Sequence, residues 1–554
     1  DGTVLSGPET VTADELNGHW RAALPAVEEA TAPGEGHILR VVGETAIELV
    51  EVAVGEVWFV AGQSNVAKWS PRSKGAQRLS AADVRTFKRG DWNRRGRFRR
   101  YVGEVAFAVG EELFAHYDDQ VTIGIVNLAV PGTVIRHWMP KDVLDRPDFP
   151  VDIKKKYSRG HGSDNERPSG SIGRFWRKLH ERVRPFSARG VLWWQGESDF
   201  ASRHTYAFGP SLLSFVREWR SKWSETDNSY LWKDVANDLP VELPVVAVLI
   251  PKGGRPGPAA APWDWDLDIE VYALPPIPET RPDIGGRDDH MMYTAFQKAS
   301  EELPDFGLVN TKDLGVRDAT HPPNRVTEYP AVLVNAMLDI VGESTDPGIG
   351  PTFLSMRTIE IAESPDRLRI EFLPGTAVLL QPSGDRSGNF AQTGRVDTIG
   401  GRSLQGIQIS DGFEWRWANL EVIPAVVEGE DDSLEVWHPQ IETPIGVSHG
   451  MSAVSTWTNL FSNAGISALP FESMLCDETG GLTVESSIVP LPEGSLNMQF
   501  SDYSSDAVRW HWELRDGFTA VSKSFQYKYK EAGWYSVRLT VWSDVDCSTQ
   551  EFLL

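Results

Sequence analysis

Cysteine is almost absent from this sequence, because its 554 residues include only Cys476 and Cys547. The two lie far apart and are expected in different domains, which excludes a disulfide framework and a cysteine metal site. No apolar run approaches the roughly 20 residues that a membrane-spanning helix requires. Insertion into a membrane is therefore not expected.

Basic residues are also scarce: 54 lysines and arginines stand against 78 acids, which gives a formal net charge of -24. Such a balance argues against binding to nucleic acid or to an anionic membrane surface. Hydrophobic residues, by contrast, make up 41% of the chain, which is ample for packed cores. At about 150 residues per domain, the length predicts three or four domains.

The apolar pattern divides the chain into four parts. Residues 1–56 show short alternating strands typical of an antiparallel lead-in. Residues 57–345 alternate buried strands with helices, which predicts a parallel sheet covered by helices. Residues 346–480 and 485–554 show only short strands, so we expect a β-sandwich-like accessory domain and a smaller all-β domain.

The second part contains the elements expected of an α/β domain. Helices are predicted at 104–118, 172–183, 212–223, 291–303 and 329–340, and strands at 57–61, 121–130, 190–194, 244–250 and 307–310.

Two insertions interrupt this alternation. Lys88–Arg100 contains seven basic residues and one acid. It either attracts an anionic substrate or partner, or is a solvated loop that pairs with neighbouring carboxylates. Lys252–Pro282 is rich in Pro, Gly and Asp, and we interpret it as a long loop over the site.

A serine stands at the end of the first buried strand. The apolar run at 57–61 stops abruptly at Gly62-Gln63-Ser64-Asn65. This pattern predicts that Ser64 lies at the carboxyl edge of the sheet, where ligands bind in open α/β folds. The alternative is an ordinary join between strand and helix, with Ser64 as the N-cap.

Three other polar segments are expected at the same edge. Segments 131–138 and 194–199 each follow a predicted strand, and segment 318–324 precedes the last helix of the α/β part. Each pattern is weak alone, because such residues are common in turns. Their occurrence together at strand ends is much more specific.

These segments supply the groups that nucleophilic catalysis requires. A serine hydroxyl is a weak nucleophile unless a base takes its proton, and His321 is the natural base for Ser64. Asp318 lies three residues before His321 and would fix its tautomer. Glu197 is the alternative acid for this orienting role.

Donors to an oxyanion are also available in these segments. The backbone N–H groups of Ser64 and Gly132, with the side-chain amide of Gln195, are candidates. One such donor lowers a barrier by about 3–4 kcal/mol.

These blocks resemble the sialate O-acetylesterase-type carbohydrate esterases, a branch of the SGNH/GDSL hydrolases that also resembles some acetylxylan esterases. The resemblance extends from about residue 18 to about 473. The matching residues are 57–65, Gly132-Thr133-Val134-Ile135 with Trp138, Trp193–Ser198, Asp318–Pro322 and the late β region 444–471. It implies a three-layer α/β/α domain with a parallel sheet.

By this resemblance Ser64, Asp318 and His321 would form a triad, with Gly132 and Gln195 in the oxyanion hole. In some relatives the glutamate that matches Glu197 is the acidic partner, so both acids stay open.

The sequence departs from the family pattern near the expected pocket. Val66 replaces a usual methionine, Ala67-Lys68-Trp69 differs, and Arg136-His137 replaces a pair that is usually acidic or polar. These departures leave the substrate open.

The last part resembles a PKD domain, an immunoglobulin-like sandwich. The matching segments are 510–517, 525–529 and 532–541. Such modules usually act as spacers or adhesion units on extracellular proteins. The resemblance therefore implies a secreted or cell-surface protein that attaches through this domain.

Together these features predict a serine esterase that needs no metal or cofactor. It would remove O-acetyl groups from an acetylated or sialic-acid-containing glycan. Trp69, Arg136, His137 and Trp138 are candidate sugar contacts, with scaffold packing as the alternative for each. The rival function is a non-catalytic carbohydrate-binding or surface-assembly protein. The basic segment at 88–100 favours an acidic glycan as substrate.

Overall fold

The structure is a computed structural model, and its description covers a large part of the chain. The described residues are 35–42, 45–67, 84–88, 91–94, 103–144, 173, 175–176, 179, 188–201, 208–224, 233–234, 239–240, 242–250, 286–311, 326, 329–344, 348–362, 364–378, 380, 407–411, 415–427, 430–450, 460–462, 466–475, 482–492, 495–514, 518–520, 522–529, 535–543 and 547–554. Among them, no helix is long and apolar enough to cross a membrane.

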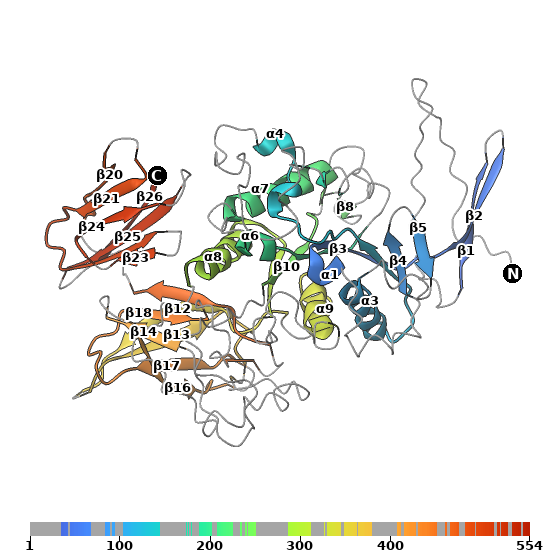
Figure 1. Ribbon diagram of the computed structural model, residues 1–554. Coiled ribbons are helices and arrows are strands. Elements are labelled where there is room, and N and C mark those ends of the chain that lie inside the picture. The colour runs from blue at the N-terminus through green and yellow to red at the C-terminus, as the bar shows by residue number, and fades with distance from the viewer. Residues whose placement is uncertain are drawn as a thin grey trace, which may run out of the picture.

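A seven-stranded sheet forms the centre of the α/β part, in the order β11-β10-β7-β3-β6-β4-β5 (Figure 1). Neighbouring strands are parallel except for β5, which runs antiparallel to β4 at the edge. The strands are β3 Glu56–Gly62, β4 Val84–Lys88, β5 Asp91–Arg94, β6 Ile123–Asn127, β7 Gly190–Trp194, β10 Val245–Leu249 and β11 Phe306–Asn310.

Helices cover both faces of this sheet, which gives three layers. The helices α3 Glu104–His116 and α9 Tyr329–Asp339 pack in one hydrophobic core, and α7 Phe208–Ser224 and α8 Gly286–Glu302 pack in the other. Short helices follow the carboxyl ends of three strands: α1 Ser64–Ala67 after β3, η2 Ile135–His137 after β6 and α6 Glu197–Ala201 after β7. A further short helix is α4 Lys141–Leu144. This arrangement confirms the three-layer α/β/α prediction.

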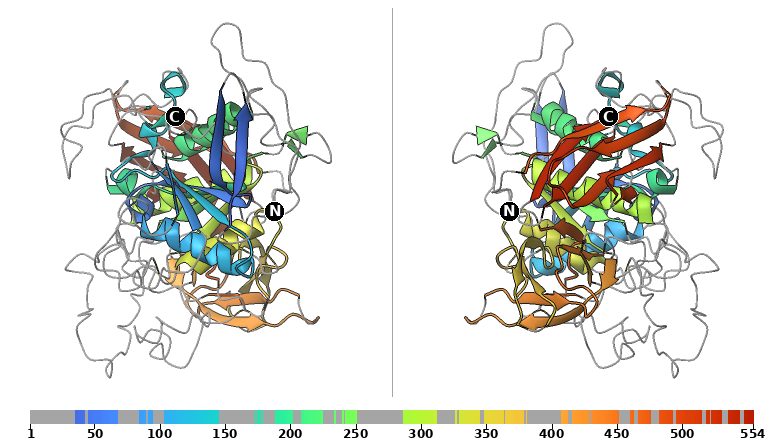
Figure 2. Two further views of the ribbon diagram at one scale, coloured as in Figure 1. Left: turned by 90° about the vertical axis from the view of Figure 1, so that its right-hand side faces the viewer. Right: turned by 90° about the vertical axis from the view of Figure 1, so that its left-hand side faces the viewer.

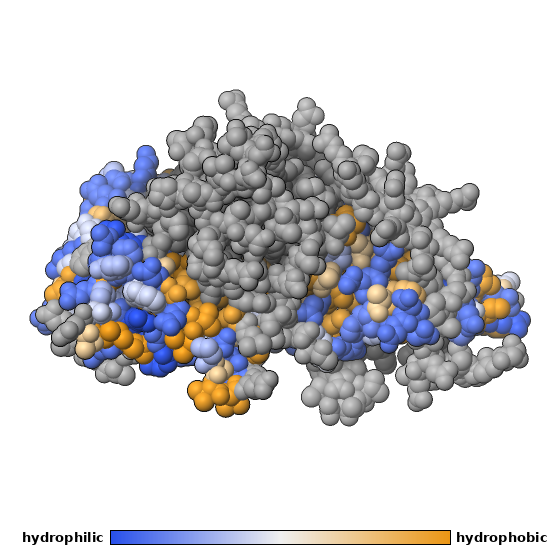
Figure 3. All heavy atoms as spheres, turned by 90° about the horizontal axis from the view of Figure 1, so that it is seen from below, coloured by the Kyte–Doolittle hydropathy of each residue, from blue (hydrophilic) through white to orange (hydrophobic). Residues whose placement is uncertain are grey.

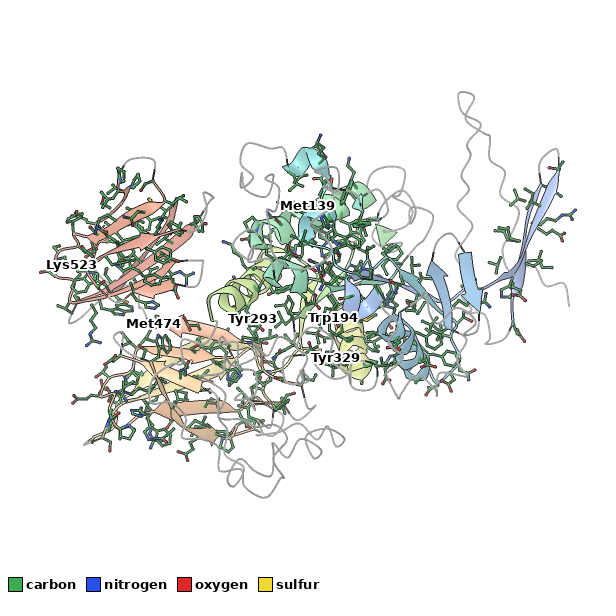
Figure 4. All side chains as sticks on the ribbon, in the orientation of Figure 1. Met139, Trp194, Tyr293, Tyr329, Met474 and Lys523 are labelled. Atoms are coloured by element: carbon green, nitrogen blue, oxygen red, sulfur yellow. The ribbon has the colours of Figure 1, made fainter. Side chains whose placement is uncertain are left out.

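Side chains of the central strands alternate between the two cores. In β3, Phe59 faces the core beneath α7 and α8, whereas Trp58 and Val60 face the core beneath α3 and α9. Trp194 stacks on Tyr329 of α9, with ring centroids 5.2 Å apart and planes 12° apart (Figure 4). Because both faces are buried, these strands are apolar throughout, and the sequence shows no alternation there.

The strand order reverses at β3. The chain continues from β3 to β4 and β6 on one side, and then crosses to β7, β10 and β11 on the other. Ligands in open α/β sheets bind beyond the carboxyl ends of the strands at such a reversal. The residues that follow β3, β6 and β7 therefore occupy the favoured place for a site.

An antiparallel hairpin precedes the sheet, formed by β1 His37–Val42 and β2 Ala46–Val52. It stands at one end of the molecule, beyond β5 (Figures 1 and 2). Its exposed apolar side chains, visible at the right-hand end of Figure 3, are Ile38, Val42, Ile47, Leu49 and Val50.

The accessory domain is a sandwich of two antiparallel four-stranded sheets. One sheet contains β12 Phe353–Ile359, β13 Arg367–Phe372, β17 Ser433–Trp437 and β16 Asn419–Ile423. The other contains β15 Trp415–Trp417, β14 Ile407–Ser410, β18 Gly446–His449 and β19 Phe471–Met474. Alternating side chains of both sheets, such as Ile370 and Ile409, form their common core.

The C-terminal domain is a second sandwich, as the PKD resemblance predicted. Its sheets are β20 Ser486–Pro490, β21 Asn497–Asp502 and β24 Ser524–Lys528, and β23 Phe518–Ala520, β22 Arg509–Leu514, β25 Ser536–Trp542 and β26 Cys547–Leu553. Phe500 and Trp512 meet edge to face in its core. A two-strand pair, β8 Lys233–Asp234 with β9 Leu239–Pro240, completes the described elements.

The two β domains are docked on each other. The Trp542 indole N–H donates to the carbonyl of Leu475 at 3.1 Å, and Trp542 packs in one cluster with Ile445 and Met474. Figure 4 shows Met474 between the two domains. Arg509 also donates to the backbone carbonyl of Asp411 at 3.4 Å. The C-terminal domain is thus seated on the accessory domain.

A disulfide accompanies this contact, which corrects the expectation from the cysteine count. Cys547 is disulfide-bonded and lies in the same cluster as Trp542. The only other cysteine in the chain is Cys476, next to Leu475 in sequence but outside the described residues. The expectation was wrong because domain docking brings together residues that are distant in sequence.

Replacing Cys547 by serine is expected to lower the unfolding temperature of the C-terminal domain. A bond that closes a loop of about 70 residues stabilises a fold by about 4 kcal/mol in the chain-entropy account. Scanning calorimetry should show equal shifts for Cys547→Ser, Cys476→Ser and the double variant, because each removes the same bond. An unfolding temperature of Cys547→Ser equal to that of the wild type would contradict the prediction.

The basic insertion differs from its expected loop form. Val84–Lys88 pairs with β6 and with Asp91–Arg94, which is the edge strand of the main sheet, so part of the segment is regular structure. The apolar pattern missed these two strands because both are short and contain few apolar residues. The predicted helix at 172–183 and the loop at 252–282 lie largely or wholly outside the described residues.

Candidate active site

Hydrogen bonds to both neighbouring strands fix the turn before Ser64. The Gln63 N–H donates to the carbonyl of Trp194 at the end of β7 (2.9 Å), and the Val130 N–H donates to the carbonyl of Gly62 (2.9 Å). Gly62 has a φ of 128°, and a Cβ there would lie 1.9 Å from the Trp194 oxygen. Only glycine fits this turn, which places Ser64 beyond the central strand.

Ser64 begins the short helix α1 and is 5% exposed. The Ala67 N–H closes the first helical turn on the carbonyl of Gln63 at 3.0 Å. From β6, the Asn127 amide donates to the carbonyl of Val66 at 3.1 Å. The serine is therefore held by three adjacent strands, β3, β6 and β7.

Gly132 stands in the turn that follows β6. It is exposed, its φ is 68°, and a Cβ placed on it would meet no atom within 4 Å. The Thr133 hydroxyl donates back to the carbonyl of Val130 at 2.9 Å. The turn thus presents a small residue to open space next to the strand that carries Ser64.

Glu197 is buried at the start of α6 and is bound to the residue after Ser64. The Asn65 amide donates to Glu197 Oε1 at 2.5 Å. Burial raises the pKa of Glu197 to about 7, and the nearby charge of Asp199 acts in the same direction. Glu197 is therefore partly protonated at neutral pH.

Gln195 and Asp199 form a second buried group. The Gln195 amide donates to the carbonyl of Thr133 at 3.0 Å and to Asp199 Oδ2 at 2.5 Å. In this arrangement both amide protons are used, so a bond to an oxyanion would require that one of these bonds breaks. Gln195 as an oxyanion donor thus remains a proposal that the described geometry does not support.

The candidate sugar contacts differ in their burial. Trp138 is 0% exposed and packs edge to face on Trp193 in the core, so a sugar contact there is not supported. His137 is buried too, with its Nδ1 accepting from the Val134 N–H at 3.4 Å. Arg136 is half-buried. Arg136 is therefore the described member of the set with the most access to a ligand.

Three predicted site residues, Trp69, Asp318 and His321, lie outside the described residues. The structure brings the others to one sheet edge: Ser64, Gly132, Gln195 and Glu197 follow the adjacent strands β3, β6 and β7.

Sequence reasoning gave no role to two buried residues at this edge, Asn65 and Asp199. Asp199 could have been found from its spacing, since it stands four residues after Gln195. Among the described residues, no group of three or more His, Cys, Asp or Glu side chains is arranged to hold a metal ion.

The raised pKa of Glu197 predicts how stability depends on pH. Its ordinary value is 4.5 and its folded value is about 7, so the folded protein binds more protons between these values. The favourable contribution of Glu197 to the free energy of unfolding is complete below pH 4.5. It is lost as the pH rises through 7, and the loss amounts to roughly 3 kcal/mol at most.

Glu197→Gln keeps the acceptor for Asn65 but cannot ionise. The unfolding temperature of this variant should therefore fall less between pH 5 and pH 8 than that of the wild type. Parallel curves for the two proteins would show that Glu197 is already ionised in the folded state at pH 5.

The fold and its serine-bearing edge define the class of three-layer α/β/α domains with a serine beyond the carboxyl end of the central strand. Within this class, residues 54–255 match the model of the family described as carbohydrate esterase, sialic acid-specific acetylesterase. Residues 485–552 match the model of the PKD domain. The chain thus combines a region of this esterase family with a PKD domain, and the family match supports an esterase.

Solved structures show similarity as well. A carbohydrate acetylesterase from Xanthomonas citri is 19% identical, with a TM-score of 0.55 over 82% of this chain and 91% of that one, which is a similarity of fold. The structure of NanS aligns over 51% of this chain and 96% of that one, at 16% identity and a TM-score of 0.31.

The PKD1 domain of a Vibrio cholerae metalloprotease is 25% identical over 14% of this chain and 95% of that one, with a TM-score of 0.13. A comparison with curated proteins found no match.

Proposed function

We propose that the protein is a serine esterase that removes O-acetyl groups from carbohydrates. The observation that carries this proposal is the position of Ser64 at the carboxyl end of β3, where the strand order reverses and where the exposed Gly132 turn lies next to it. Open α/β sheets bind ligands at that point. The family match over residues 54–255 supports the same chemistry.

In the proposed reaction, Ser64 Oγ attacks the acetyl carbonyl while His321 takes the hydroxyl proton. The oxyanion that forms accepts hydrogen bonds from the backbone N–H groups of Ser64 and Gly132. The tetrahedral intermediate collapses to acetyl-serine, and His321 returns the proton to the sugar oxygen that leaves. Water then hydrolyses acetyl-serine in the same manner, which yields acetate.

The acid that orients His321 is proposed to be Asp318 rather than Glu197. An orienting carboxylate must be ionised to stabilise the imidazolium that forms. Burial raises the pKa of Glu197 to about 7, and one of its oxygens already accepts from Asn65. Glu197 is better suited to hold the segment that follows Ser64.

An acidic glycan is the proposed substrate class. Arg136 stands in the segment that contains Gly132. Burial raises the pKa of Asp199 to about 7, and the positive charge of Arg136 nearby opposes that shift. The basic stretch 88–100 belongs partly to the strands β4 and β5 on the β6 side of the sheet. Positive charge in a chain of net charge -24 would draw an anionic sugar to this side.

The proposed location is extracellular or at a cell surface, with attachment through the PKD domain. The disulfide at Cys547 supports an oxidising compartment, since disulfides are rare in reducing ones.

Acetate release from a panel of acetylated polysaccharides tests the proposed function. We expect release from at least one acidic glycan, with a preference over neutral glycans that weakens as salt rises. A fluorophosphonate probe should label Ser64 in the same preparation. No release and no labelling would favour the rival function, a carbohydrate-binding protein that retains the fold.

A further inference from the structure

Asp199 links two loops of the candidate site. It is 3% exposed, and its carboxylate accepts the Ile135 N–H at 3.2 Å on Oδ1 and 3.0 Å on Oδ2. It also accepts the Gln195 amide at 2.5 Å on Oδ2. Ile135 follows β6 and Gln195 follows β7, so one buried side chain connects the ends of two strands that flank β3.

The link encloses the turn that contains Gly132. On one side, the Val130 N–H is fixed to the carbonyl of Gly62. On the other side, the carbonyl of Thr133 accepts the Gln195 amide and Ile135 is held by Asp199. Pro131 and Gly132 are exposed between these fixed points, and a Cβ placed on Gly132 would meet no atom within 4 Å.

We propose that Asp199 is a positioning residue, which acts through Gln195 and Ile135 to set the place of the Gly132 amide relative to Ser64. This inference rests on the proposed esterase function. Stabilisation of an oxyanion depends on donor positions within about 0.5 Å, so a looser turn would weaken it.

The link depends on the pairing of the Gln195 amide, a donor, with the Asp199 carboxylate, an acceptor. Gln195 has two amide protons and uses one on Thr133 and one on Asp199. In Asp199→Asn, an amide group would replace one acceptor oxygen, so a donor would face either Gln195 or the Ile135 N–H. The substitution therefore removes one of the two acceptor oxygens and sets a donor against a donor, which weakens the link while the volume of the side chain is preserved.

Asp199→Asn is expected to lower kcat by about 10–100-fold, with KM within about 3-fold of the wild type. Rates should be taken per active site, after titration of Ser64 with a fluorophosphonate, so that loss of folded protein does not count. An arylboronic acid forms a tetrahedral adduct on the serine, and its Kd should rise by the same factor as kcat falls.

Asp432→Asn in the accessory domain is the matched control. Asp432 is 5% exposed and accepts two backbone N–H groups, from Leu380 at 2.8 Å and Ala425 at 3.0 Å. Its loss should destabilise its own domain and leave kcat per active site unchanged.

A double variant tests the route of the effect. Gln195→Met removes the bond that Gln195 makes to Asp199, together with its bond to Thr133, and leaves the bond between Asp199 and Ile135 in place. Because one bond is shared, Asp199→Asn with Gln195→Met should lose less activity than the product of the two single losses. Losses that multiply would show that Gln195 acts independently and would overturn the inference. If Asp199→Asn fails to fold, Gln195→Met takes its place as the test variant. Its kcat should fall and its Kd for the arylboronic acid should rise by the same factor.

The proposed esterase function and the positioning role of Asp199 can be tested separately. If the wild type shows no Ser64-dependent turnover, the proposed function fails and this inference fails with it. If the wild type is active and Asp199→Asn matches its kcat per active site, only the positioning role of Asp199 is wrong.

Discussion

Ser64→Ala is expected to lower kcat for ester hydrolysis by roughly 10⁴-fold or more. Removal of the nucleophile from a serine hydrolase eliminates the acyl-enzyme route, and only the much weaker effect of binding and oxyanion donors remains. The side chain is small and lies at the start of a four-residue helix, so its loss should leave the fold intact. Acetate release and p-nitrophenyl acetate hydrolysis measure the effect.

Ser448→Ala provides the control for this experiment. Ser448 is buried like Ser64 but lies in β18 of the accessory domain. It should retain wild-type turnover. Equal rates for wild type and Ser64→Ala would show that any hydrolysis arises elsewhere, and the carbohydrate-binding function would then be favoured.

The sequence was sufficient to predict the central sheet and its serine. A run such as Val57–Ala61 that is apolar on both faces is typical of a parallel strand covered on both sides. The glycine that follows it allows the turn that presents Ser64. Because parallel strands share one carboxyl edge, Gly132 and Glu197 could be expected there from local pattern alone.

Contacts between distant residues could not be predicted in the same way. The role of Asp199 depends on Ile135, which is 64 residues away, and no local pattern encodes that pairing. The disulfide of Cys547 depends on how two sandwiches dock. Trp138 could be a sugar platform or core from its sequence, and only its burial decides between them.

Gly62→Ala is expected to destabilise the α/β domain by at least about 3 kcal/mol and to abolish most Ser64 activity. A side chain at a φ of 128° is strained in itself, by about 1–3 kcal/mol. The added Cβ would also lie 1.9 Å from the backbone oxygen of Trp194, which cannot move without shifting β7. Both costs act on the residue two positions before the nucleophile.

Gly342→Ala is a control that distinguishes backbone strain at a positive φ from the steric overlap of an added Cβ. Gly342 also has a positive φ, of 72°, but a Cβ there would meet no atom within 4 Å. Its substitution should cost about 1–2 kcal/mol from backbone strain alone and leave kcat unchanged. Calorimetry of both variants, with Ser64 titration by a fluorophosphonate, makes the comparison. The prediction fails if Gly62→Ala unfolds at the same temperature as Gly342→Ala and its Ser64 still reacts with the fluorophosphonate. In that case the position of Ser64 does not depend on tight packing between the turn after β3 and the end of β7.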